Sequence, residues 1–122
     1  MRINDIRISE NFKLYEFECN DGSHQVVIHP RLLQLAQKLR EHLGKPIVIH
    51  SAYRTTEYNR KIGGSPNSRH LLGEAIDVRA VLGLTIDQLA SSGRAVGFTG
   101  IGKYPWGCHF DIRDKATEWD YR

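Results

Sequence analysis

The chain has 122 residues, of which 40% are hydrophobic and 25% are charged. This length supports one domain with a sizeable core and is too short for two. The net charge of +3 comes from 17 basic and 14 acidic residues that are interspersed along the chain, so no basic arm indicates a nucleic-acid-binding protein. No stretch approaches the roughly 20 apolar residues of a membrane-spanning helix. We therefore expect one monomeric domain over residues 1–122 that neither binds nucleic acid nor inserts into a membrane.

Residues 9–17 predict a short capped helical turn with an aromatic edge. The clearest helix is predicted over residues 30–43, because a proline suits its first turn and Gly44 ends it. Apolar residues recur in it every three or four positions and form one stripe: Leu32, Leu35, Ala36, Leu39 and Leu43. Residues 46–50 then form a β-rich run.

In the next segment, Thr55 is placed to cap a short helix that runs to Lys61, and residues 62–68 have almost no helix or strand propensity. Residues 75–80 alternate in the manner of a strand. Thr85 and Gln88 have the spacing of a capping box, which predicts a helix as far as about Val96.

Two further strands are predicted over residues 98–104 and 107–113, joined as a hairpin. This order of elements favours an α+β fold, in which a small, mostly antiparallel sheet is flanked by helices. Trp119 and Tyr121, near the end of the chain, are expected to pack that end onto the domain.

Three residues form a candidate metal site. Asp77 follows His70 by seven positions, and His109 follows Asp77 by 32. Asp77 and His109 both lie in strand-like apolar segments, where a polar side chain is costly to bury unless it is paired or bound to a metal. We expect the two to lie on neighbouring strands with their side chains on one face, and His70 to approach from a loop. Two imidazoles and a carboxylate suit Zn²⁺ and leave a fourth position for water, as in catalytic zinc sites.

Other interpretations of these residues remain open. Asp77 could form a buried pair with a histidine without any metal, and His50 is the main rival ligand. The two cysteines, Cys19 and Cys108, are expected to be free and partly buried; a single disulfide, or a thiol beside the metal, is the alternative. Cys108 directly precedes His109, so on a strand its side chain points to the opposite face.

Several motifs in order resemble the zinc D-Ala-D-Ala carboxypeptidase family of bacterial and phage peptidoglycan peptidases. The resemblance covers about residues 12–113, and the same metal-site architecture is shared by lysostaphin-type endopeptidases and the hedgehog signalling domain. The motifs that carry it are Ser51-Ala52-Tyr53-Arg54, Tyr58-Asn59, Gly63-Gly64, Ser68-Arg69-His70-Leu71-Leu72-Gly73-Glu74-Ala75-Ile76-Asp77, Gly100-Ile101-Gly102-Lys103-Tyr104-Pro105 and Cys108-His109-Phe110-Asp111-Ile112-Arg113.

The resemblance implies a zinc-dependent peptidase that hydrolyses amide bonds in peptidoglycan stem peptides, as a D-Ala-D-Ala carboxypeptidase or an endopeptidase. His70, Asp77 and His109 would be the Zn²⁺ ligands. Arg54 would stabilise the substrate carbonyl or the charge that develops on it, Ser68 would hold the substrate backbone, and Tyr104 would donate a hydrogen bond to the oxyanion.

One position departs from the family pattern. Many relatives place an acidic general base three residues before the second histidine ligand, where this chain has Trp106. Asp111 lies two residues after His109 and shares its face on a strand. It is therefore a candidate catalytic base, or alternatively a group that orients the imidazole. Glu74 is the remaining acidic candidate.

The missing acid keeps a second function open, that of a non-catalytic, zinc-retaining wall-binding domain. A wall hydrolase must act in the periplasm or outside the cell, yet the first residues lack the apolar core of a signal peptide. A phage-encoded enzyme released at lysis or carried on a virion would resolve this conflict, as would a leader that has been removed; we favour the phage-encoded enzyme.

Overall fold

The computed structural model describes all of residues 1–122. Its elements, in chain order, are β1 (Arg7–Ser9), β2 (Phe12–Lys13), the 3₁₀ helix η1 (Leu14–Phe17), α1 (Pro30–Leu43), β3 (Ile49–Ser51), α2 (Thr56–Lys61), the 3₁₀ helix η2 (Arg69–Leu72), β4 (Ala75–Arg79), α3 (Ile86–Val96), β5 (Gly100–Tyr104), β6 (Gly107–Asp111) and β7 (Thr117–Asp120). None of the helices combines the length and apolar character needed to cross a membrane.

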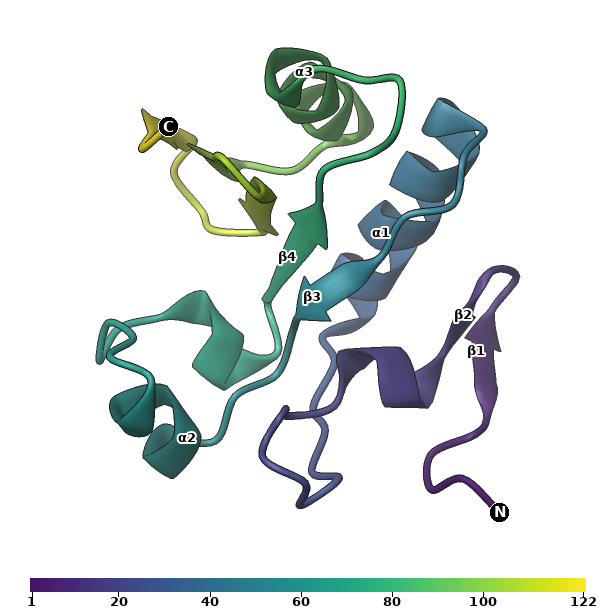
Figure 1. Ribbon diagram of the computed structural model, residues 1–122, viewed down its shortest axis with the longest axis vertical. Coiled ribbons are helices and arrows are strands. Elements are labelled where there is room, and N and C mark those ends of the chain that lie inside the picture. Colours follow the sequence, from purple (N-terminus) through teal and green to yellow (C-terminus); the bar gives the residue numbers. More distant parts are fainter.

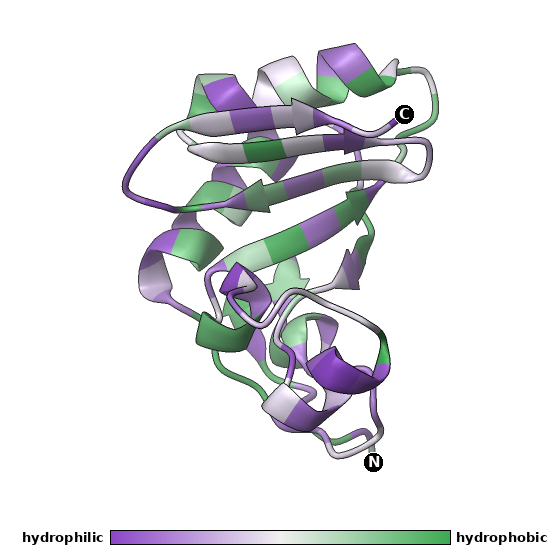
Figure 2. Ribbon diagram, turned by 90° about the vertical axis from the view of Figure 1, so that its left-hand side faces the viewer, coloured by the Kyte–Doolittle hydropathy of each residue, from purple (hydrophilic) through white to green (hydrophobic).

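A five-stranded sheet in the order β3-β4-β6-β5-β7 organises the molecule. Its first four strands pair antiparallel, and β7 joins the edge of β5 in parallel. Helices α1 and α3 lie behind the sheet in Figure 2, and the segment with α2 and η2 lies beside the near face (Figures 1 and 2). The predicted α+β fold with a mostly antiparallel sheet is confirmed, and the finer likeness to the hedgehog domain stays a prediction.

The two long helices form where the sequence predicts them. The apolar stripe of α1 is buried from Leu32 to Leu39 in a core of 16 residues that also includes Ile76 and Phe110 of the sheet, and Leu43 packs against this core half-buried. Gly44 ends α1 with a φ of 62°, a conformation that glycine adopts without strain. At the start of α3, the hydroxyl of Thr85 accepts from the Gln88 amide at 3.0 Å and the Gln88 side chain accepts from the Thr85 amide at 2.9 Å. The predicted capping box is therefore confirmed.

Two parts of the fold differ from the predictions. Residues 9–17 hold only one turn of 3₁₀ helix, because residues 12–13 pair instead with β1 as a short hairpin. The end of the chain forms the strand β7, which the sequence analysis did not predict. A strand of four residues has a weak pattern, and its parallel pairing with β5 depends on long-range contacts that a local pattern does not encode.

Gly93 in α3 provides a test of core packing. Glycine in a helix interior normally costs about 1 kcal/mol relative to alanine. Here a Cβ at Gly93 would lie 2.7 Å from ring atoms of Phe110, which is itself stacked on Phe98 with 5.0 Å between ring centroids. We expect Gly93→Ala to destabilise the protein by about 1–2 kcal/mol, because overpacking outweighs the gain in helix propensity. Urea denaturation would measure it, with Ser91→Ala on the exposed face of α3 as control; equal stabilisation by both would contradict the prediction.

Candidate active site

The pairing of β4 with β6 brings two of the three candidate ligands together. Asp77 and His109 are direct partners in this antiparallel ladder, so their side chains leave the same face of the sheet. The neighbouring residues Val78 and Cys108 point to the opposite face and are buried in the core. The alternation of these strands therefore separates an apolar core face from a polar site face.

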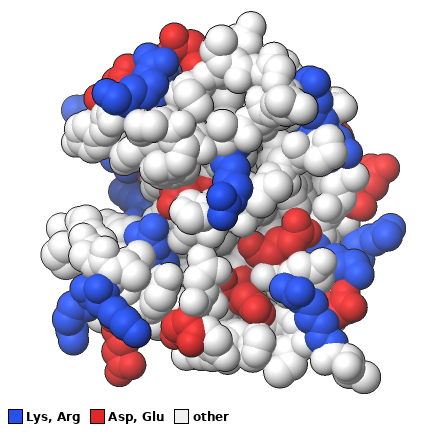
Figure 3. Space-filling model, viewed as in Figure 1, with Lys and Arg blue, Asp and Glu red and all other residues white.

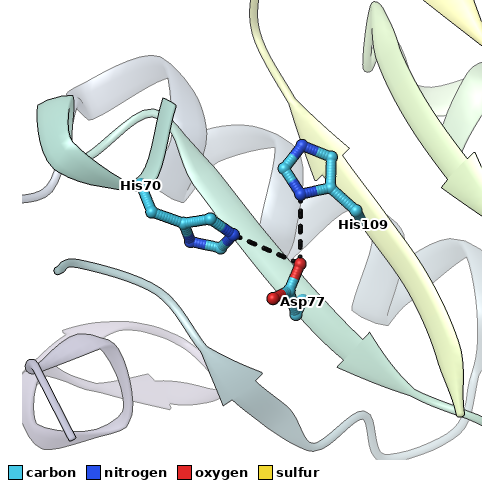
Figure 4. A group of neighbouring side chains, drawn as sticks. All are labelled: His70, Asp77 and His109. Atoms are coloured by element: carbon cyan, nitrogen blue, oxygen red, sulfur yellow. Dashed lines mark hydrogen bonds and ion pairs between the residues drawn. The ribbon is translucent and has the colours of Figure 1, made fainter. Parts of the chain in front are cut away.

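The third candidate ligand comes from η2. The hydroxyl of Ser68 accepts from the His70 amide at 3.2 Å and caps this short helix. Gly73, with a φ of 69°, then turns the chain into β4. His70 was predicted to lie on a loop and lies instead on one turn of 3₁₀ helix. Figure 4 shows all three side chains pointing toward one another.

The spacing of the donor atoms fits one metal ion. His70 Nε2 lies 3.3 Å and His109 Nδ1 lies 3.1 Å from Oδ1 of Asp77, and the three ligand atoms lie within 4.8 Å of one another. Bonds of about 2.0–2.2 Å at tetrahedral angles, as zinc prefers, place ligand atoms about 3.3–3.5 Å apart. The group is buried at His70 and Asp77 and half-buried at His109, so water screens it little.

The outer nitrogens of both imidazoles are held by acceptors. His70 Nδ1 donates to the carbonyl oxygen of Ala52 at 2.6 Å, and His109 Nε2 donates to Oδ2 of Asp111 at 2.7 Å. In neutral rings the inner nitrogens therefore carry lone pairs, and both face the carboxylate of Asp77. Three atoms with lone pairs therefore converge with no hydrogen-bond donor between them. This arrangement favours the binding of a cation.

The ionisation of the group reflects the same convergence. Burial by itself would raise the pKa of Asp77, but hydrogen bonds and charge from His109 and His70, when the inner nitrogens of these rings are protonated, outweigh it and hold that pKa well below its usual range. Burial would lower the pKa of His109, yet the carboxylates of Asp111 and Asp77 raise it above its ordinary value. Without a metal, a proton on His109 takes the place of the cation, so protons and metal ions compete for the site.

Asp111 lies behind His109 and is fully buried, with 0% of its surface exposed. Besides its bond with His109, it accepts from Arg113 Nη2 at 2.6 Å and from Arg113 Nε at 2.9 Å. Burial raises the pKa of Asp111, but Arg113 and His109 together bring it far below the usual range. The carboxylate lies directly against Gly100, where no side chain would fit. Of its two predicted roles, this position favours orienting the imidazole.

Arg54 is held on the other side of Asp77. Its guanidinium donates to Asp77 Oδ2 at 3.3 Å and to Asn59 Oδ1 at 3.2 Å, and its Nε donates to Ser51 Oγ at 3.2 Å. Its side chain is 14% exposed. The guanidinium thus fixes the carboxylate of Asp77 and still presents a positive charge beside the three candidate metal ligands.

The three candidate ligands lie in a cleft of about 550 Å³. Arg54, Ser68 and Tyr104, the predicted substrate-binding residues, all line it. The residues that line it without having been predicted as site residues are Ser65, Asn67, Arg69, Trp106, Arg113 and Trp119. Trp119 packs the end of the chain onto the domain, as expected, and because β7 carries it to the cleft it also lines the site.

Three arginines and one carboxylate, Asp77, give the cleft lining its excess of positive charge. On the face shown in Figure 3, by contrast, basic and acidic side chains are interspersed. A cleft of this character favours an anionic or strongly polar ligand over an apolar one.

Two rival residues lie apart from the donor group. His50 is exposed and packs near Trp106, with 5.6 Å between ring centroids. Glu74 accepts from Arg69 at 3.2 Å and lines a separate hollow, to which Arg69 also contributes. Neither side chain reaches the three donor atoms.

Cys19 and Cys108 are both free and buried, so the two-thiol prediction is confirmed and the disulfide alternative is wrong. Burial raises the pKa of the Cys108 thiol to about 12. At pH 8 only about one Cys108 in ten thousand would be a thiolate, the reactive form. We expect iodoacetamide to leave Cys108 unlabelled in the native protein over an hour and to label it fully in urea. Rapid native labelling, mapped by peptide mass, would contradict this.

Three protein ligands beside an open cleft are typical of catalytic metal sites rather than of closed structural ones. The site therefore has the character of a metal-dependent hydrolase. The comparison with known families agrees: the model of the Peptidase M15 family matches residues 10–112, and the chain belongs to this family. The family expected from the motifs is confirmed.

A similar curated protein is the zinc D-Ala-D-Ala carboxypeptidase of Streptomyces albus G, which is 38% identical over 66 residues. That alignment covers 53% of this chain and 26% of the relative, so the chain matches about a quarter of that protein's length.

Proposed function

We propose that this protein is a zinc peptidase that hydrolyses amide bonds in peptidoglycan stem peptides, as a D-Ala-D-Ala carboxypeptidase or an endopeptidase. The observation that carries the proposal is the convergence of His70 Nε2, His109 Nδ1 and Asp77 Oδ1 beside the cleft. Membership of a peptidase family, and similarity to a zinc D-Ala-D-Ala carboxypeptidase, support both the metal and the substrate class.

His70, Asp77 and His109 would hold the ion. When bound, zinc lowers the pKa of water to about 7 and polarises a carbonyl group. Arg54 would place its guanidinium where negative charge develops on the carbonyl oxygen, while its bonds to Asn59 and Ser51 keep it from reorganising during the reaction.

Ser68 and Tyr104 would contribute polar contacts to the substrate. Ser68 Oγ already accepts from the His70 amide, and its own hydroxyl proton remains available to a substrate carbonyl. Tyr104 Oη accepts from Trp119 Nε1 at 2.8 Å, which leaves its hydroxyl proton free to be donated. Both side chains can therefore donate to the substrate without losing the bonds that position them.

The place of action follows from the substrate. Peptidoglycan lies outside the cytoplasmic membrane, so we propose that the protein acts in the periplasm or outside the cell, as a monomer. Release of a phage-encoded enzyme at lysis is the route we propose.

Zinc content and product formation together test the proposal. We expect about one zinc per chain and release of D-Ala, or of shortened stem peptides, from purified peptidoglycan, with both zinc and products lost after chelation and restored by added zinc. His70→Ala should lose both, whereas His42→Ala, an exposed histidine on α1, should keep both. Chelator-resistant release of products by His70→Ala would refute the proposal.

One observation favours a second function, a zinc-retaining wall-binding domain without catalysis. Asp77 is the only acidic residue that lines the cleft, and Trp106 occupies the position where the resemblance expects a general base. Asp111 is buried behind His109 with both oxygens engaged. Full zinc occupancy, binding to purified walls and no product by mass spectrometry would establish this alternative.

A further inference from the structure

The C-terminal strand β7 builds part of the cleft from residues beyond the stretch that the family model matches, which ends at residue 112. β7 lies against β5 in parallel, with Trp119 opposite Gly102. Gly102 is in turn the partner of His109 on β6. Trp119, Gly102 and His109 therefore lie in one row across the site face of the sheet.

Gly102 makes room for the indole of Trp119. A Cβ at position 102 would collide with the indole, with ring atom Cζ2 only 2.7 Å away. The indole can therefore lie across the backbone of β5 and reach the imidazole of His109, at 5.3 Å between ring centroids. Arg113 lies on another side of the indole, with its guanidinium carbon 5.0 Å from the ring centre.

The indole is also fixed by a hydrogen bond and continues into a larger aromatic surface. Its Nε1 donates to Tyr104 Oη at 2.8 Å, and Tyr104 stacks on Trp106 with 4.8 Å between centroids and 13° between planes. Trp106 is 38% exposed. All three rings line the cleft, whose other lining residues are polar or charged. The cleft thus has one aromatic wall, defined by Tyr104, Trp106 and Trp119.

We propose that Trp119 is a specificity-determining residue: its indole supplies the part of the aromatic wall beside His109 against which the uncharged hydrocarbon face of the substrate packs. This inference rests on the proposed peptidase function. Bound peptide would present its carbonyl to Arg54 and its apolar face to the indole, since Arg54 contacts the candidate ligand Asp77 and the indole contacts the candidate ligand His109. Substrates that lack a small apolar group next to the cleaved bond would bind less tightly.

Steady-state kinetics on an N-acetylated peptide ending in D-Ala-D-Ala tests this role. We expect Trp119→Ala to raise KM about tenfold, as expected from loss of an aromatic contact, with kcat within about threefold and zinc content unchanged. Trp119→Phe should restore part of the loss. Glu118→Gln, which removes the ion pair between β7 and Arg94 of α3, is the control for docking of the strand and should leave KM unchanged. An unchanged KM in Trp119→Ala, or a joint loss of zinc and kcat at constant KM, would overturn the proposal.

Tryptophan fluorescence tests peptide binding at Trp119 separately from peptide hydrolysis. The chain has two tryptophans, both of which line the cleft, so replacing Trp106 leaves Trp119 as the only tryptophan that emits. In Trp106→Phe, emission from Trp119 should change saturably with the same peptide, read before measurable turnover. Turnover of the peptide without any change in Trp119 emission would refute the proposed role of Trp119, while the proposed peptidase function would remain supported. A saturable change in Trp119 emission without any turnover would support contact between the peptide and Trp119 and would refute the proposed peptidase function.

Discussion

Replacing Asp77 by asparagine is expected to remove the bound metal and to lower the rate of peptide hydrolysis by at least about a thousandfold. Asp77 Oδ1 is the atom on which both imidazoles converge, at 3.1 and 3.3 Å. The asparagine amide has nearly the same shape as the carboxylate but carries no charge. The two neutral imidazoles would then face the ion without a negatively charged ligand. A thousandfold loss corresponds to about 4 kcal/mol of the barrier, within the several kcal/mol that a metal supplies.

Zinc per chain by elemental analysis, and product release at several zinc concentrations, would measure this effect. The control is Asp21→Asn, an exposed carboxylate in a turn far along the chain from the cleft. Circular dichroism would show that Asp77→Asn still folds, because the amide can keep the bond from Arg54. Retention of stoichiometric zinc and of the wild-type rate would refute the role of Asp77.

The sequence predicted the parts of the fold that local patterns encode. The stripe of α1 and the capping box of α3 depend on neighbours three or four residues apart, and both predictions agree with the structure. The alternation of β4 and β6 also predicted that Asp77 and His109 share a face, which the register of the two strands shows.

What the sequence did not reveal depends on contacts between distant segments. Trp119 reaches the cleft only because β7 pairs with β5 in parallel and because Gly102 leaves space for an indole. Arg113 is near the predicted motif, but its two bonds to Asp111 follow from the end of β6 rather than from any spacing. A glycine in a strand was the one available signal of such a close approach.

The two roles open to Asp111 lead to different outcomes for Asp111→Asn. If Asp111 orients His109, the amide no longer holds the imidazole through a charged bond, and metal affinity should fall about 10–100-fold. Activity at saturating zinc should then stay within about tenfold of the wild type. A general base would give the opposite result, namely normal zinc affinity and a loss of about 10²–10⁴ in kcat.

We expect the first outcome, together with a loss of stability. Asp111 is fully buried and Arg113 is only 25% exposed on its side chain, so removing the carboxylate leaves a guanidinium with little compensation. Breaking such a buried pair costs about 3–5 kcal/mol, which partial access of Arg113 to water brings to about 2–3 kcal/mol. Thermal unfolding of zinc-free protein would measure this loss separately from metal binding.

A matched double variant decides whether the loss comes from the stranded arginine or from the imidazole. In Asp111→Asn with Arg113→Gln, both members of the pair are neutral, so most of the lost stability should return. Zinc affinity should stay low, because His109 Nε2 still lacks a charged acceptor at the 2.7 Å position. Recovery of zinc affinity together with stability would show that Asp111 serves the fold and not the site. Wild-type zinc affinity in the single variant, with kcat alone collapsed, would instead make Asp111 the base.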